Sequence, residues 1–243
     1  MKAGRRNERT VFMRLSSRIK LLRLKLIRAR WRHDHSTRIL ITGCGRSGTN
    51  YVARALSSIG FPFCHEGFPQ KGIAAWPLAV KNDEPMPWWM LFKQGDFVFK
   101  PVLHQVRHPL AVIASTQTFA NSSWRYIEKF IPIKENDSLL LKCMKYWHYW
   151  NLKAEEVSEW TYRVESFPGI FPEFCEKMGH PELIEKKDKF TQMVKTVNTR
   201  AKRLDKNPLK LSKKSVTWSR LEAEDRELCA LIRKQAQKYG YPD

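Results

Sequence analysis

A seven-residue stretch near the start of the chain combines glycines with a cation. Residues 43–49 read G-C-G-R-S-G-T, so three glycines crowd a tight loop that also carries Arg46. Glycines let backbone N–H groups approach an anion closely, and an arginine adds charge and hydrogen bonds. The stretch therefore predicts a cradle for a phosphate-like anion. The residues expected to line it are Gly43, Gly45, Arg46, Ser47, Gly48, Thr49 and Asn50.

The residues on either side of this loop predict the elements that hold it. Arg38 to Thr42 form a short apolar and β-branched run, which is typical of a buried strand. After the loop, apolar residues recur at helical spacing as far as Ile59, and Gly60 is a stop signal. A strand, a glycine-rich loop and a helix in this order direct the positive end of the helix dipole at the anion.

The loop departs from the common pattern of nucleoside-triphosphate sites. It matches G-x-x-x-x-G-K-[ST] only in part, because Thr49 takes the lysine position and the cation has moved to Arg46. This departure counts against an ordinary NTP hydrolase or kinase. The run G-x-G-R-S-G-T-x-Y-V instead resembles the 5′-phosphosulfate loop of the sulfotransferases that use 3′-phosphoadenosine 5′-phosphosulfate (PAPS), which have R-S-G-T or K-S-G-T there.

A second stretch strengthens the resemblance. Residues 107–115 read R-H-P-L-A-V-I-A-S after a predicted strand over 96–107, and they look like the family's 3′-phosphate segment, R-[DH]-P-x-x-x-x-x-S. Pro109 suits a first helical turn, Arg107 offers a bidentate cation, and Ser115 lies about two turns further on. The resemblance implies that Arg107 and Ser115 bind the 3′-phosphate that distinguishes PAPS from ATP, in one cleft with Arg46.

A histidine and a glutamate follow the loop on a short predicted strand over 61–67. Sulfuryl transfer to an alcohol needs a general base, because a neutral hydroxyl is a poor nucleophile. The family supplies this base from a Glu or His soon after the loop, which favours Glu66, with His65 as the alternative. The resemblance also gives Arg46 the task of offsetting charge on the bridging oxygen. Both His65 and Glu66 would equally suit a strand end or a salt bridge.

The resemblance continues weakly toward the C-terminus, where Asn198 and Arg200 are expected to approach the nucleotide. The long connection over 68–95 is expected to help form the acceptor pocket. Its Trp88 and Trp89 would suit stacking on a sugar or ordinary packing. The R-K-G-x-x-G-D-W loop of the cytosolic small-molecule sulfotransferases is absent, so the residues that close over the adenine stay open.

Positive charge dominates the composition and is concentrated at the start. The 243 residues carry a net charge of +20, and residues 1–38 contribute thirteen Lys or Arg against two acids. Within residues 1–36, apolar positions from Leu15 to Leu26 recur at helical spacing and predict a basic amphipathic helix. Such a helix can bind an anionic membrane surface or pack on the domain. A partner with phosphate, sulfate or carboxylate groups is expected, but no motif for specific nucleic-acid recognition accompanies the charge.

The cysteines indicate a reducing compartment. They are five in number, scattered, and nowhere spaced C-x-x-C, which argues against a disulfide framework and a zinc site, and no metal site is expected. No apolar run suits a membrane span or the core of a signal peptide. The expected location is the cytoplasm of a bacterial cell, with residues 1–36 able to bind the inner face of the membrane.

The remaining pattern predicts four further elements. Helices are expected over 137–158, 168–178 and 222–238, and a strand over 160–167. Residues 121–136 are expected to be a loop. We found no internal repeat.

These observations predict two parts, a basic amphipathic extension over 1–36 and a sulfotransferase-like domain over 37–243. The expected fold is α/β, a P-loop-type parallel sheet with helices on both faces, preceded by a basic N-terminal helix. The expected reaction moves the sulfuryl group of PAPS to a hydroxyl of a carbohydrate or related acceptor and leaves PAP. Two alternatives stay open: a P-loop phosphotransferase that uses a nucleotide, and a non-catalytic protein that binds polyanions. Neither the acceptor nor the oligomeric state is predicted.

Overall fold

The computed structural model describes residues 37–80, 97–197 and 215–242 of the chain. Several predictions concern residues outside these ranges. They are the predictions for residues 1–36, Trp88, Trp89, Asn198 and Arg200.

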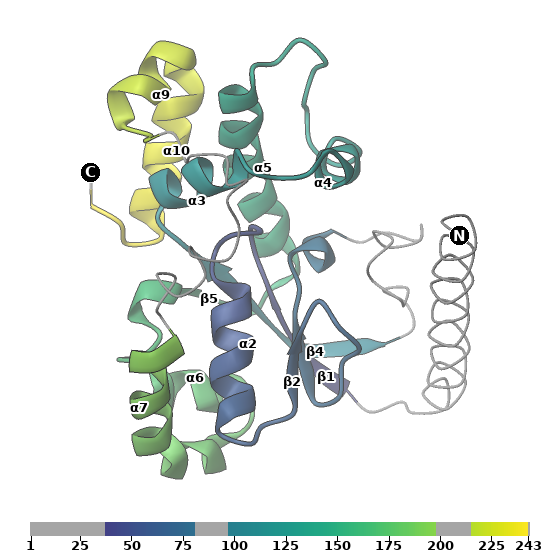
Figure 1. The fold of residues 1–243 in the computed structure, drawn as a ribbon, viewed down its shortest axis with the longest axis vertical. Helices are drawn as coiled ribbons and strands as arrows, with labels where there is room; N and C mark the ends of the chain where they lie inside the picture. The colour runs from purple at the N-terminus through teal and green to yellow at the C-terminus, as the bar shows by residue number, and fades with distance from the viewer. Residues whose placement is uncertain (1–36, 81–96, 198–214, 243) are drawn as a thin grey trace, which may run out of the picture.

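A parallel sheet forms the centre of the described structure (Figure 1). Its strands are β1 (Thr37–Thr42), β2 (Phe63–His65), β3 (Gly72–Ala74), β4 (Val98–Val106) and β5 (Trp160–Arg163). They pair in the order β2-β3-β1-β4-β5, and every pair is parallel. The predicted α/β class with a parallel sheet is therefore confirmed. Strands β2 and β3 lie on one side of β1, and β4 and β5 lie on the other. The direction in which the chain adds strands thus reverses at β1, and the carboxyl ends of β1 and β4 are neighbours there. Open α/β sheets bind ligands at such a point.

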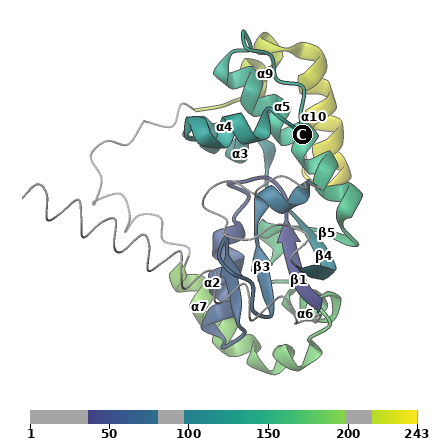
Figure 2. The ribbon, with the colours of Figure 1, turned by 90° about the vertical axis from the view of Figure 1, so that its right-hand side faces the viewer.

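The helices divide into two groups in space. In Figures 1 and 2, α3, α4, α5, α9 and α10 gather beyond one end of the sheet, whereas α2, α6 and α7 lie beside the strands. In the described ranges, no helix is both long and apolar enough to cross a membrane. The α-helices are α2 (Thr49–Ser58), α3 (Pro109–Thr116), α4 (Asn121–Ile127), α5 (Leu139–Val157), α6 (Phe171–Lys177), α7 (Lys187–Val197), α9 (Trp218–Glu224) and α10 (Arg226–Lys238). The 3-10 helices are η1 (Trp76–Ala79), η3 (Val164–Ser166) and η4 (Pro181–Lys186).

Alternation along β1 explains how the sheet is covered. Successive side chains of a strand point to opposite faces. Ile39 and Ile41 join the core formed with α2, α6 and α7, whereas Leu40 joins Ile73 and Leu78 in another cluster. A third, aromatic cluster lies where the strands end, and it contains Val106 and the loop residue Cys44 together with side chains of α3, α5 and α10. The loop after β1 is thus embedded in the packing between sheet and helices.

Three local predictions differ from the structure. The predicted loop over 121–136 begins with α4, whose Trp124 and Ile127 are buried in the aromatic cluster. The predicted strand over 160–167 ends at Arg163 and continues as η3. The connection over 68–95 begins with β3 and η1, which are too short and too uniformly buried to show a sequence period.

The predicted last helix over 222–238 is also wrong, because it is interrupted. Asp225 has an extended backbone, which ends α9, and its carboxylate accepts a hydrogen bond from Leu228 N at 2.9 Å, which begins α10. Aspartate is a preferred N-cap residue, so the break has a local cause.

Candidate functional site

The two predicted anion-binding stretches meet at the carboxyl edge of the sheet. Gly43 to Thr49 connect β1 to α2, and Arg107 follows β4, the neighbouring strand. The Arg107 guanidinium donates a hydrogen bond from Nη1 to the main-chain oxygen of Arg46 at 3.1 Å. The structure therefore brings Arg107 into direct contact with the loop, so the two arginines do not lie on opposite sides of the molecule.

Strand β4 fixes the backbone of the loop. Gly43 has φ 146°, and a Cβ there would lie 2.2 Å from the main-chain oxygen of Gln105, so no other residue fits without a shift. The buried Gln105 amide donates to the main-chain oxygen of Ser47 at 2.9 Å and accepts from the Tyr162 hydroxyl at 2.8 Å. Gln105 thus ties the loop to β4, and Tyr162 of β5 holds Gln105 in turn.

Helix α5 holds the loop from the other side. The Gly45 N–H donates to the Tyr146 hydroxyl at 2.6 Å, and a Cβ on Gly45 would lie 2.9 Å from the Phe119 ring. Burial raises the pKa of Tyr146 well above its usual value, so the phenol stays protonated. The Ser47 N–H donates to the main-chain oxygen of Cys44 at 3.1 Å. Two N–H groups of the predicted cradle, those of Gly45 and Ser47, are thus already bonded within the chain.

The start of α2 offers the groups that an anion would use. Gly48 precedes the helix in the left-handed conformation, φ 99°, and no side chain caps the first turn. Uncapped N–H groups at a helix start favour negative charge. The Ser47 hydroxyl is buried and has no hydrogen-bond partner among the described residues. A buried polar group without a partner is costly, so a ligand atom in reach of it would be stabilised.

The two arginines of the predicted site and Ser115 differ in exposure and in contacts. Arg46 is exposed, has φ 72°, and places its guanidinium 5.2 Å from the centre of the Phe119 ring. The main-chain oxygen of Arg107 accepts from Trp147 Nε1 at 3.2 Å, which ties this turn to α5. Ser115 lies in α3 and is only 2% exposed, and within the described structure no hydrogen bond joins its hydroxyl to Arg107. The structure brings the loop and Arg107 together, and among the described residues it shows no hydrogen bond between the Ser115 side chain and either of them.

The two candidates for the general base, His65 and Glu66, lie beside the loop. His65 is the last residue of β2, and its Nε2 lies 3.1 Å from Thr49 Oγ1 at the start of α2. Burial lowers the pKa of His65 to about 4, so the ring is neutral near pH 7. Its 3.6 Å separation from Glu66 Oε1 is accordingly not an ion pair at that pH. Glu66 follows β2 in the left-handed conformation, with φ 50°.

The other predicted site residues add little. Asn50 is exposed on the first turn of α2. Asn198 and Arg200 lie outside the described ranges. Within those ranges, no three His, Cys, Asp or Glu side chains are grouped so that they could hold a metal ion.

Sequence reasoning missed the residues that support the site. Tyr146 follows Gly45 by about a hundred positions, so no linear signal connects them. Gln105 precedes Arg107 by two residues on a predicted strand, and this spacing puts both side chains on one side of the strand. This two-residue spacing is the sequence signal that could have placed Gln105 near the site.

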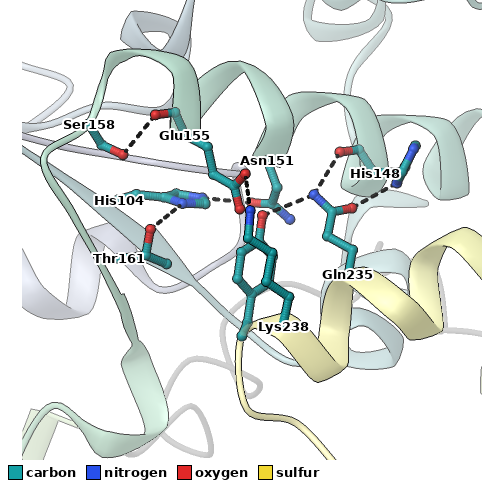
Figure 3. Close-up of polar contacts among 9 residues, drawn as sticks. His104, His148, Asn151, Glu155, Ser158, Thr161, Gln235 and Lys238 are labelled. Atoms are coloured by element: carbon teal, nitrogen blue, oxygen red, sulfur yellow. Dashed lines mark hydrogen bonds and ion pairs between the residues drawn. The ribbon is translucent and has the colours of Figure 1, made fainter.

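A buried polar network lies beyond β4, near a separate hollow. His104 of β4 approaches Asn151 of α5 at 3.1 Å and Thr161 of β5 at 3.2 Å (Figure 3). The hollow, of about 740 Å³, runs along β5 and is lined by residues such as Glu155 and Trp160. It contains none of the predicted site residues, so it is not the predicted donor site.

Comparison with protein-family models, with curated proteins and with solved structures finds no match to this chain.

Proposed function

We propose that this chain is a PAPS-dependent sulfotransferase that acts on a hydroxyl of a carbohydrate or related acceptor. One observation carries the proposal: Arg107 Nη1 bonds to the main-chain oxygen of Arg46 at 3.1 Å, so the two motif stretches share one site. They also follow β1 and β4, the adjacent strands where a ligand is expected in a sheet of this order. The proposed loop type is the P-loop variant with R-S-G-T.

The donor would be held by groups of both stretches. The uncapped start of α2 and the buried Ser47 hydroxyl suit the oxygens of the 5′-phosphosulfate. Arg107 would bind the 3′-phosphate, and its contact with a main-chain oxygen would be exchanged for a charged one. Ser115 would complete that pocket. Bound PAPS supplies the activated sulfuryl group.

The residues around the loop would provide the remaining chemistry. Glu66, next to the Thr49–His65 contact, would take the proton of the acceptor hydroxyl. The exposed guanidinium of Arg46 would stabilise negative charge that develops on the bridging oxygen. His65 would keep Thr49 and the strand end in place, since its ring is held in the neutral form.

The proposal includes a location. All five cysteines are free, which suits a reducing compartment, so we place the enzyme in the cytoplasm. Binding of residues 1–36 to an anionic membrane surface belongs to the proposal too, although those residues lie outside the described ranges.

Nucleotide selectivity tests the donor assignment. We expect PAP to bind and to raise the melting temperature, and AMP and ATP to bind at least tenfold more weakly, because neither carries a 3′-phosphate. Arg107→Ala should weaken PAP binding by about 1 to 3 kcal/mol, measured by calorimetry, and should leave AMP binding unchanged. Arg54→Ala, at an exposed site on α2, is the matched control. Tighter binding of ATP than of PAP would favour the phosphotransferase alternative and contradict our proposal.

A further inference from the structure

A carboxylate joins two distant parts of the chain beside Arg107. Glu165 Oε1 accepts a hydrogen bond from His108 N at 3.1 Å, and Oε2 accepts from the Tyr241 hydroxyl at 2.7 Å. His108 directly follows Arg107 and precedes α3. One side chain therefore connects the β4–α3 turn to the segment after α10.

Further contacts fasten the same segment. The Arg163 guanidinium donates to the main-chain oxygen of Gly240, and its Cζ lies 5.5 Å from the centre of the Tyr241 ring. The Tyr241 ring also packs edge-on against the His108 ring, with centroids 5.3 Å apart. We call Arg163, Glu165, Gly240 and Tyr241 the latch.

Two titratable side chains at the latch, Tyr241 and His108, are uncharged at neutral pH. Burial raises the pKa of Tyr241, and the Glu165 carboxylate that it bonds raises this pKa further, so the hydroxyl remains a donor. Burial lowers the pKa of His108, and the nearby Arg107 lowers it too, although Glu165 acts in the opposite direction. A neutral His108 keeps a further positive charge away from Arg107.

We propose that Glu165 and Tyr241 are positioning residues for Arg107, so that the latch sets the affinity for the 3′-phosphate without touching the nucleotide. This inference rests on the proposed donor site. The turn that carries Arg107 is otherwise held through its main chain by Trp147 and through its side chain by the loop. Glu165 holds the next N–H group, so loss of the latch frees the turn on the side facing α10.

The test compares two latch variants with a matched control. Tyr241→Phe and Glu165→Ala remove parts of the latch, and Tyr239→Phe removes a hydroxyl of the same segment that bonds to Gln235 instead. Hydrogen exchange of the peptide over 107–110 is measured without ligand. Dissociation constants for PAP and AMP are measured by calorimetry, in the wild-type and in the Arg107→Ala background.

We expect faster exchange over 107–110 in both latch variants and not in Tyr239→Phe. PAP should bind about three- to tenfold more weakly, as expected for one lost hydrogen bond, while AMP binding stays unchanged. In the Arg107→Ala background, Tyr241→Phe should cause no further loss.

Each part can fail separately. If exchange is unchanged, the latch does not hold the turn; if exchange rises but PAP binds as before, it does not position Arg107. If wild-type protein shows no preference for PAP over AMP, the proposed function fails instead, and the exchange measurement, which needs no nucleotide, still decides the latch.

Discussion

At the scale of single residues, His65 and Glu66 are neighbours with different chemistry. Burial brings the pKa of His65 down to about 4, and its Nε2 already contacts Thr49 Oγ1. The histidine is thus a weak and occupied base. The resemblance to the sulfotransferases favours the neighbouring carboxylate, so our proposal gives the role of base to Glu66 and the contact with Thr49 to His65.

We therefore predict different losses for the two residues. Glu66→Gln should lower sulfate transfer from labelled PAPS to a panel of glycans and alcohols by at least about a hundredfold, the lower range for loss of a general base. PAP affinity should stay within twofold of wild type, because Glu66 does not bind the donor. His65→Gln should lower transfer less than tenfold. Wild-type turnover in Glu66→Gln, or a larger loss in His65→Gln, would move the base to His65 or elsewhere.

Residue types predict an anion site, but they do not predict the side chains that hold the backbone of the loop. The glycines and Arg107 were found because glycine loops and helix-starting Arg-x-Pro runs are local in sequence. The reason why Gly43 must be glycine, the oxygen of Gln105 at 2.2 Å, comes from another strand. Likewise, Tyr146 reaches Gly45 from α5. Such contacts depend on how the sheet is ordered, and a single sequence gives no measure of that order.

At the scale of elements, predictions succeeded where a period was long or a stop signal was present. The helix after the loop spans Thr49–Ser58 and is followed by Gly60 with φ 86°, as predicted. The three-residue β3 has no room to show a period. The sequence alone does not mark Asp225 as a stop, although its side chain caps the next helix.

The elements β4, α5 and β5 are joined by His104, which gives the fold a dependence on pH. Burial is the main reason that the pKa of His104 falls to about 4, with the hydrogen bond to Asn151 and the charge of Glu155 opposing the shift. The unfolded chain therefore binds more protons than the folded chain between about pH 4 and 6.5. The contribution of His104 to the free energy of unfolding is therefore complete above about pH 6.5 and decreases as the pH falls toward 4.

We predict that His104 accounts for about 2 kcal/mol of the stability lost between pH 7 and pH 5. His104→Gln should be less stable at both pH values, and its loss between them should be smaller than that of wild type by this amount. Urea unfolding followed by circular dichroism measures the free energies, with His180→Gln as control. An unchanged pH dependence would contradict the prediction. Should the variant not fold, NMR of the wild-type histidines decides it, since His104 must stay neutral at pH 5.

At the scale of the whole molecule, the charge of +20 supports two different kinds of binding. A basic surface attracts any polyanion by releasing its counterions, which makes the affinity fall steeply with salt. The carboxyl edge of the sheet instead offers a few groups in fixed places, the loop and Arg107. Interactions in such a partly buried site are screened much less. Salt therefore separates general anion binding from binding at the proposed site.

We predict that the two kinds of binding respond differently to sodium chloride and to Arg107→Ala. Between about 50 and 500 mM salt, affinity for a heparin oligosaccharide should fall by about a thousandfold or more, whereas that for PAP should fall by about tenfold. Arg107→Ala should weaken only PAP binding, because one charge among forty-four Lys and Arg hardly alters the surface. Fluorescence anisotropy measures heparin, and calorimetry measures PAP. Equal salt dependence for both ligands, with no effect of Arg107→Ala, would identify a general polyanion binder.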